Sequence, residues 1–213
     1  MKIAVLLYER FTALDAIGPY EVLCRLPGAE LEFVAAERGE VRTDNGMLTL
    51  IAERSIAEVA CAEIVLVPGG PGEVAARAGG PVLEWLRAVH ETTTWTTSVC
   101  TGSLILAAAG LLEGRRATSH WLALGQLAAL GAEPVSERVV FDEKIVTAAG
   151  VSAGIDMALQ LAASVAGEQV AQAIQLGVEY DPQPPFDAGS PSKAPAEIVQ
   201  LLREHSRFQV QLA

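Results

Sequence analysis

The stretch "WTTSVCTGSLILAAAGLL", residues 95–112, places a cysteine where a β-branched run gives way to a helical pattern of small and apolar residues. Residues 95–99 favour a buried strand, and residues 101–112 favour a helix. A sharp strand-to-helix turn holds the residue at the turn above the helix N-terminus. We therefore expect Cys100 at the carboxyl end of a strand, which is where ligands gather in open α/β sheets.

Short strand-like runs alternate with longer helical runs on both sides of this stretch. Further buried strands are predicted at 2–8, 31–37 and 62–70, and helices at 13–26, 81–91, 121–130 and 153–167. Asn45-Gly46 predicts a hairpin, and two more short strands are expected around a turn at 142–144. The alternation predicts one α/β domain over residues 1–213, with a mainly parallel sheet flanked by helices. Only the proline-rich residues 181–195 are expected to be irregular.

The composition excludes several classes of function. The net charge is −11 and no basic cluster occurs, which argues against a nucleic-acid partner. No apolar run approaches the ~20 residues of a membrane span, and the first residues lack a secretory signal, so we expect a cytoplasmic protein. The three cysteines, Cys24, Cys61 and Cys100, are widely spaced with no CxxC motif. This spacing indicates free thiols and predicts no metal site.

The setting of Cys100 is typical of a nucleophile. The positive end of the following helix is expected to lower the pKa of the thiol, and backbone N–H groups near Thr101 could bind an oxyanion. Gly102 would allow a tight turn after a strained residue. Burial as a small apolar side chain is the alternative for Cys100, and spacing alone does not separate the two. Cys24 and Cys61 lack this setting and are interpreted as structural.

Two other segments place candidate residues at the same edge of the predicted sheet. In "VPGGPGEVA", the Gly70 N–H could supply a second oxyanion donor, although a plain strand-to-helix turn explains the glycines equally well. In "LDAIGPYE", Asp15 either caps a helix or lies beside Cys100 and carries a proton. Glu21 is the competing carboxylate. His120 in "ATSHW" is a candidate base, with a partly buried structural histidine as the alternative.

The elbow "SVCTGS", the turn "VPGGPG" and the segment "LDAIGPYE" together resemble the ThiJ/PfpI superfamily, whose fold resembles that of class I glutamine amidotransferases. Within it, "GPYEVL", "SVCTGSLILAAAGLL", "ATSHW", "SAGIDMAL" and "YDPQPPFDAGSP" are most similar to isonitrile hydratases, also called cyclohexyl-isocyanide hydratases. The likeness spans nearly the whole chain, and the proline-rich segment is its most specific part.

This resemblance implies a flavodoxin-like fold and a homodimeric hydro-lyase without metal or organic cofactor. The implied reaction adds water to an isonitrile through a cysteine thioimidate and gives an N-substituted formamide. Cys100 would be the nucleophile, Asp15 the acid/base carboxyl and Thr101 an essential helper. Related peptidases carry histidine directly after the nucleophile, where this chain has Thr101, so a Cys-His peptidase is disfavoured.

Two other functions remain open from the sequence. The first is a cysteine-dependent carbonyl-stress or redox protein, of glyoxalase or deglycase type, in the same superfamily. The second is a ligand-sensing domain, because AraC-type regulators carry a similar elbow and "THW" segment. Those regulators continue into a DNA-binding helical module, for which this chain offers no counterpart in its pattern.

Overall fold

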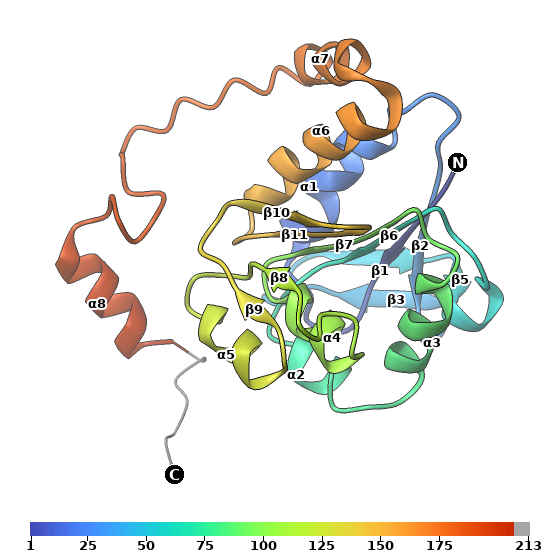
Figure 1. Cartoon of the computed structure of the whole chain (residues 1–213), viewed down its shortest axis with the longest axis horizontal. Coiled ribbons are helices and arrows are strands. Elements are labelled where there is room, and N and C mark those ends of the chain that lie inside the picture. Colours follow the sequence, from blue (N-terminus) through green and yellow to red (C-terminus); the bar gives the residue numbers. More distant parts are fainter. Residues whose placement is uncertain (207–213) are drawn as a thin grey trace.

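The computed structural model describes residues 1–206 and is built around a seven-stranded sheet (Figure 1). The strand order is β10-β11-β7-β6-β1-β2-β5. These strands are β1 (Lys2–Leu6), β2 (Glu30–Ala35), β5 (Arg54–Ser55), β6 (Ile64–Val67), β7 (Trp95–Val99), β10 (Val139–Asp142) and β11 (Ile145–Ala148). Every neighbouring pair is parallel except β10 and β11. The prediction of a mainly parallel α/β sheet is therefore confirmed.

Helices cover both faces of the sheet (Figure 1). The α-helices of the described chain are α1 (Ala13–Leu23), α2 (Glu73–Ala76), α3 (Pro81–His90), α4 (Gly102–Ala108), α5 (Leu124–Ala129), α6 (Ala153–Ala166), α7 (Glu168–Gly177) and α8 (Ala196–Glu204), and α8 lies apart from the sheet. Helices α1, α6 and α7 lie on one face, and α2, α3, α4 and α5 lie on the other. Strand β6, "IVLV", is buried throughout because Ile64 and Val65 belong to apolar clusters on opposite faces.

Two small sheets lie outside the central one. Strands β3 (Gly39–Arg42) and β4 (Thr49–Ala52) form an antiparallel hairpin around Gly46, which has a φ of 71°. This confirms the hairpin predicted from Asn45-Gly46. Strands β8 (Arg116–Ala117) and β9 (Glu133–Pro134) pair in parallel on the chain between α4 and β10.

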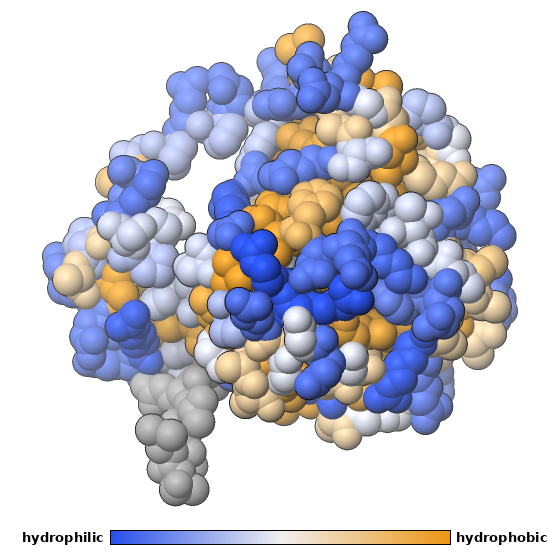
Figure 2. All heavy atoms as spheres, in the orientation of Figure 1, coloured by the Kyte–Doolittle hydropathy of each residue, from blue (hydrophilic) through white to orange (hydrophobic). Residues whose placement is uncertain are grey.

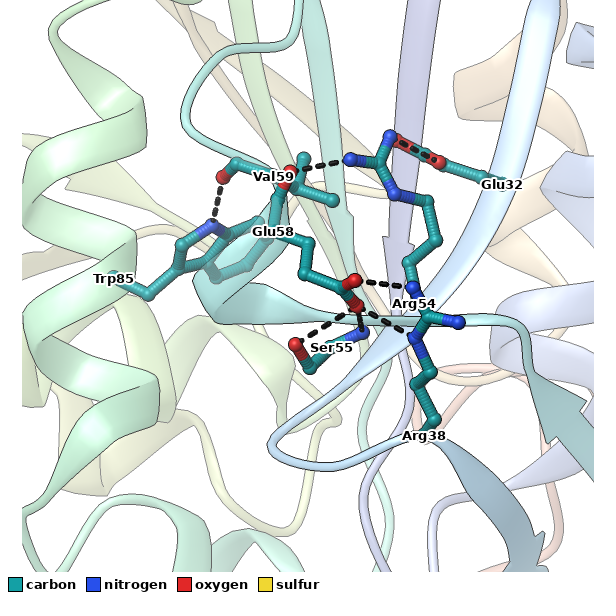
Figure 3. A network of polar contacts seen from close by, with 7 residues as sticks. All are labelled: Glu32, Arg38, Arg54, Ser55, Glu58, Val59 and Trp85. Atoms are coloured by element: carbon teal, nitrogen blue, oxygen red, sulfur yellow. Dashed lines mark hydrogen bonds and ion pairs between the residues drawn. The ribbon is translucent and has the colours of Figure 1, made fainter.

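A network of charged side chains lies beside β5, at one edge of the central sheet (Figure 3). The Glu58 carboxylate, in the 3-10 helix η1 (Ile56–Glu58), accepts hydrogen bonds from Arg38 and from the Ser55 N–H at 2.9 Å. These contacts lower the pKa of Glu58 to about 2. Nearby, the Trp85 indole donates to the Val59 carbonyl at 2.7 Å. A two-residue strand followed by fixed charges leaves little free edge for another strand to join.

The chain beyond α7 separates from the body of the protein (Figure 1). Residues 181–195 form no helix or strand, as predicted from their prolines, and lead into α8. We call residues 181–204 the C-terminal arm. The space-filling view shows an open gap between this arm and the body (Figure 2). Within residues 1–206, the helices are all too short or too polar to cross a lipid bilayer.

Candidate active site

The candidate site lies beyond the carboxyl ends of three neighbouring strands. Strand β6 pairs with β1 on one side and with β7 on the other, so the segments after them emerge at one edge of the sheet. Asp15 follows β1, Gly69 and Gly70 follow β6, and Cys100 follows β7. The structure brings Asp15 and Cys100 into contact, because the Asp15 carboxylate hydrogen-bonds the Cys100 thiol.

Cys100 stands on the sharp turn that the sequence predicts. Its φ of 58° lies in the left-handed region, which is uncommon for a residue with a side chain. The backbone is held there from both sides. The Cys100 N–H donates to the carbonyls of Ala148 and Ala149 at 3.0 and 2.9 Å. Its carbonyl accepts from the hydroxyls of Ser103 and Ser119 at 3.1 and 3.0 Å.

Gly102 is required next to the elbow for a reason other than the one predicted. Its φ is outside the left-handed region, so the backbone conformation at this position does not require a glycine. Instead, a Cβ atom at Gly102 would lie 2.1 Å from the carbonyl oxygen of Val67, at the end of β6. The first turn of α4 therefore packs its backbone directly against the neighbouring strand end.

Asp15 is fully buried and is bonded to the glycine turn across the site. Its Oδ2 accepts from the Gly69 N–H at 2.9 Å, although the two residues are far apart in sequence. A Cβ atom at Gly69 would lie 2.9 Å from this oxygen and 2.5 Å from the Thr101 nitrogen. Asp15 lies in the first turn of α1, whose N-cap is Thr12. Its carboxylate thus joins α1 to the site and does more than cap a helix.

The Gly70 N–H is engaged differently from the prediction. It donates to the Thr101 hydroxyl oxygen at 3.0 Å, so it is not directed at a second oxyanion position. Gly70 therefore acts on the site through Thr101, which is fully buried. Because the hydroxyl oxygen accepts from Gly70, its own proton can be donated to another group.

The pKa of the Cys100 thiol is raised to about 12, so the expectation of a lowered pKa is wrong. The largest cause is burial, since only 3% of the residue is exposed. The negative charge of Asp15 raises the pKa further, whereas the backbone N–H groups of Val151 and Thr101 act in the opposite direction. Burial beside a carboxylate therefore outweighs the short helix α4 and its N-terminal dipole.

The two remaining candidates lie in different places. Glu21 is half exposed on α1 and forms an ion pair with Arg25 at 2.8 Å, so the structure does not bring it to Cys100. His120 lines a cavity of about 390 Å³. A Cβ atom at Gly150 would lie 2.8 Å from its ring, and its Nδ1 accepts from the Leu122 N–H at 3.3 Å. An accepting Nδ1 places the ring proton of neutral His120 on Nε2.

Sequence reasoning missed two groups that hold the thiol and the elbow. The Val151 N–H hydrogen-bonds the Cys100 sulfur, and Val151 itself has a φ of 31°. Ser119 holds the Cys100 carbonyl and immediately precedes His120 in the "ATSHW" segment. The paired glycine and β-branched residue in "AAGVSAG" is the signal that could have indicated Val151 as a second strained position.

The fold and the cysteine elbow define a known class of protein. The model of the DJ-1/PfpI family matches residues 1–164, and the chain belongs to that family.

Particular relatives are more informative. The chain is 40% identical to an isonitrile hydratase from Pseudomonas putida over 212 residues, covering 100% of this chain and 92% of that protein. It is 27% identical to a deglycase from Pyrococcus abyssi over 144 residues, covering 67% of this chain and 86% of that protein. A crystal structure of a ThiJ/PfpI family protein from Pseudomonas syringae superimposes with a TM-score of 0.93 at 38% identity, covering 95% of this chain and 84% of that one.

Proposed function

We propose that the protein is an isonitrile hydratase, a hydro-lyase that converts an isonitrile into an N-substituted formamide. The full-length similarity to the Pseudomonas putida enzyme supports this reaction. The observation that carries the proposal is the hydrogen bond between the buried Cys100 thiol and the Asp15 carboxylate. It joins a nucleophile to an acid/base group, which are the two functions that hydration of a terminal carbon requires.

In the first half of the reaction, the thiol adds across the isonitrile carbon. The raised pKa keeps Cys100 protonated at neutral pH, so the adjacent Asp15 carboxylate must take the proton as sulfur attacks. Asp15 then delivers that proton to the carbon atom bonded to sulfur. An S–H bond breaks, S–C and C–H bonds form, and the carbon–nitrogen triple bond becomes the double bond of a thioimidate.

In the second half, water hydrolyses the thioimidate. Asp15 accepts one proton from the water as its oxygen adds to the carbon and passes that proton to the nitrogen, which leaves a hydroxyl group on the carbon. The carbon–sulfur bond then breaks as the C=O bond forms, the hydroxyl proton of the intermediate passes through Asp15 to the sulfur, and the formamide leaves. The Thr101 hydroxyl, fixed by Gly70, donates a hydrogen bond to the substrate nitrogen or orients the water. Protons balance over the two halves, and the enzyme returns to its starting state.

An infrared assay tests the reaction directly. Cyclohexyl isocyanide is mixed with the protein, and the isocyanide stretch is followed while N-cyclohexylformamide is identified by mass spectrometry. We expect the stretch to disappear with catalytic turnover, and Cys61→Ala to match the wild type because Cys61 is an exposed thiol. Absence of turnover with methyl and cyclohexyl isocyanides would reject the proposal.

A carbonyl-directed activity is the second candidate, and the similarity to the Pyrococcus abyssi deglycase favours it. The same buried cysteine could attack a dicarbonyl instead of an isonitrile. Methylglyoxal and a glycated thiol are therefore assayed beside the isonitriles. Higher kcat/KM on the carbonyl substrates than on any isonitrile would replace the first candidate with the second.

We propose a homodimer in a reducing, cytoplasmic setting as the working form of the enzyme. The three cysteines of the described chain are free thiols, which suits such a compartment. Sedimentation at micromolar concentration tests the assembly, and a monomer there would reject the dimer.

A further inference from the structure

The cavity lined by His120 adjoins the candidate site through Ser119 and Val151, which both contact Cys100. Its walls come from four stretches of chain, at 118–121, 136–138, 149–152 and 189–191, with Leu124 completing them. Val151 belongs both to this wall and to the site, because its N–H hydrogen-bonds the Cys100 sulfur. A volume of about 390 Å³ is within the range of small-molecule pockets.

The charged side chains on the cavity wall have partners within the protein. Glu137 forms an ion pair with Arg116 at 2.8 Å. Arg138 pairs with Asp156 and donates to the Ser152 hydroxyl at 3.3 Å. A wall whose charges are already neutralised favours an uncharged ligand, because an ionic ligand would have to displace these pairs.

The apolar wall of the cavity is joined to the C-terminal arm. Arg203, on α8, lies over the Trp121 ring with its guanidinium carbon 5.9 Å from the ring centroid. Gly189, Ser190 and Pro191, on the same arm, line the cavity themselves. The arm thus leaves the body after α7, passes around the gap that Figure 2 shows and meets the body again at the cavity.

We infer that Trp121 and the C-terminal arm select the substrate by enclosing its uncharged, apolar N-substituent, while the isonitrile carbon reaches Cys100 past Val151. This inference rests on the proposed function for its substrate class. In it, Trp121 provides the aromatic face, Pro191 closes the opposite side and Arg203 keeps the arm against the ring. These residues set which substituent binds, and the reacting atoms contact Cys100 and Asp15.

Trp121→Ala tests the aromatic face by comparing a large substrate with a small one. Removing the ring should lower kcat/KM for cyclohexyl isocyanide about tenfold through KM, with kcat nearly unchanged. The kcat/KM for methyl isocyanide, which is too small to reach the ring, should change about twofold or less. Trp121→Phe, which keeps an aromatic ring, should retain most of the wild-type kcat/KM for cyclohexyl isocyanide. An equal loss for both substrates, or no loss for either, would overturn the inference.

Arg203→Ala tests the arm, and Gln200→Ala on the same helix is its matched control. Within the described residues, the Gln200 side chain donates a hydrogen bond to Glu204 of the same helix at 2.8 Å and forms no hydrogen bond with the body. Arg203→Ala should raise the KM for cyclohexyl isocyanide about threefold to fivefold and leave the KM for methyl isocyanide unchanged. An equal rise in KM for Gln200→Ala and Arg203→Ala would overturn the role of the arm in substrate selection.

A binding measurement separates this inference from the proposed reaction. N-cyclohexylformamide is titrated by calorimetry into Cys100→Ser and into Cys100→Ser combined with Trp121→Ala. Binding that weakens about tenfold in the double variant supports the cavity assignment even if no isonitrile is turned over. Equal binding by the two proteins overturns the cavity assignment even if the wild type hydrates isonitriles.

Discussion

Two acidic groups of this protein, Glu58 and Asp15, have opposite settings. Glu58 is solvent-exposed at the β5 edge, where Arg38 and the Ser55 backbone stabilise its negative charge and lower its pKa to about 2. Asp15 is fully buried, and its charge acts on the neighbouring Cys100 thiol, whose pKa is raised to about 12. A carboxylate with a cation beside it in water keeps its charge until the pH falls to about 2. A buried carboxylate beside a protonated thiol instead forms a pair of groups between which a proton can move.

The comparison also explains why abundant ion pairs say little about function here. Surface pairs such as Arg38–Glu58 are screened by solvent and contribute little to stability. The Asp15–Cys100 contact is shielded from water, so small changes of charge there have large chemical effects. Variants at Cys100, Asp15 and Thr101 should therefore affect turnover far more than a variant at Glu58 does.

Cys100→Ala should abolish formamide production, because no sulfur remains to form the thioimidate. Cys100→Ser should be nearly inactive, since a hydroxyl is a much weaker nucleophile at neutral pH. Turnover of cyclohexyl isocyanide is measured for each variant, and circular dichroism confirms the fold. Turnover by Cys100→Ala would rule out covalent catalysis.

Asp15→Asn should lower turnover by roughly a hundredfold to ten-thousandfold, the range typical of a lost general acid–base group. The same change removes the negative charge that raises the pKa of Cys100, so iodoacetamide should modify Cys100 faster than in the wild type at pH 8. Mass spectrometry after short labelling times measures this rate. Near-normal turnover with unchanged labelling would mean that Asp15 has only a structural role.

Thr101→Val should have a smaller effect than Asp15→Asn and lower turnover about tenfold to a hundredfold, because it removes one hydrogen-bond donor and keeps the shape. The Gly70 N–H also loses its acceptor in this variant. Thr101→Ser restores the hydroxyl and should recover most of the activity, which separates a missing hydrogen bond from a packing defect. Equal activity of the two variants would exclude a role for the hydroxyl.

The raised pKa of Cys100 predicts a loss of stability in alkali. The unfolded thiol loses its proton near its ordinary pKa of 9.0, whereas the folded thiol keeps it until about pH 12. The unfolded state therefore binds fewer protons in this window, and the free energy of unfolding falls as pH rises through it. Melting temperatures between pH 8 and pH 11, compared with those of Cys100→Ser, measure the effect. Parallel curves for the two proteins would contradict the raised pKa.

Glu58→Gln should have the smallest effect. Turnover should be unchanged, and the melting temperature should fall only slightly at neutral pH. Because the folded pKa of Glu58 is lowered from 4.5 to about 2, its contribution is present above pH 4.5 and is lost as pH falls toward 2. The difference in melting temperature between Glu58→Gln and the wild type should therefore shrink as the pH falls from 4.5 to 2, and it should also shrink in molar salt. A lasting difference under both conditions would show that packing, not charge, is lost.

Much of the fold could be predicted because its strands have a strong local signature. The fully apolar run of β6 and the β-branched run of β7 are buried on both faces, and such strands form parallel sheets. Parallel strands also explain why Asp15, Gly70 and Cys100 could be expected at one edge. The meeting of these residues depends on topology, which the alternation of strands and helices already indicates.

The finer arrangement of the site could not be predicted in the same way. Whether Gly70 donates to Thr101 or to a substrate depends on how the turn places its nitrogen, which lies 3.0 Å from the Thr101 hydroxyl oxygen. The direction of the Cys100 pKa shift depends on how burial and the Asp15 charge compare with two N–H groups, which no spacing rule reports. The meeting of Arg203 and Trp121 depends on the path of an irregular arm.

The close approach of backbones at Gly69 and Gly102 limits how this enzyme could evolve. Any side chain at Gly102 would collide with the Val67 carbonyl, and any at Gly69 would collide with the Thr101 backbone. In a library of random substitutions, both codons should therefore accept glycine alone. On the cavity wall around Trp121 the close approach is of a different kind, since a Cβ atom at Gly150 would meet the His120 side chain and not a backbone atom. New substrate ranges should consequently arise by mutation of that wall, while the chemistry at Cys100 is inherited unchanged.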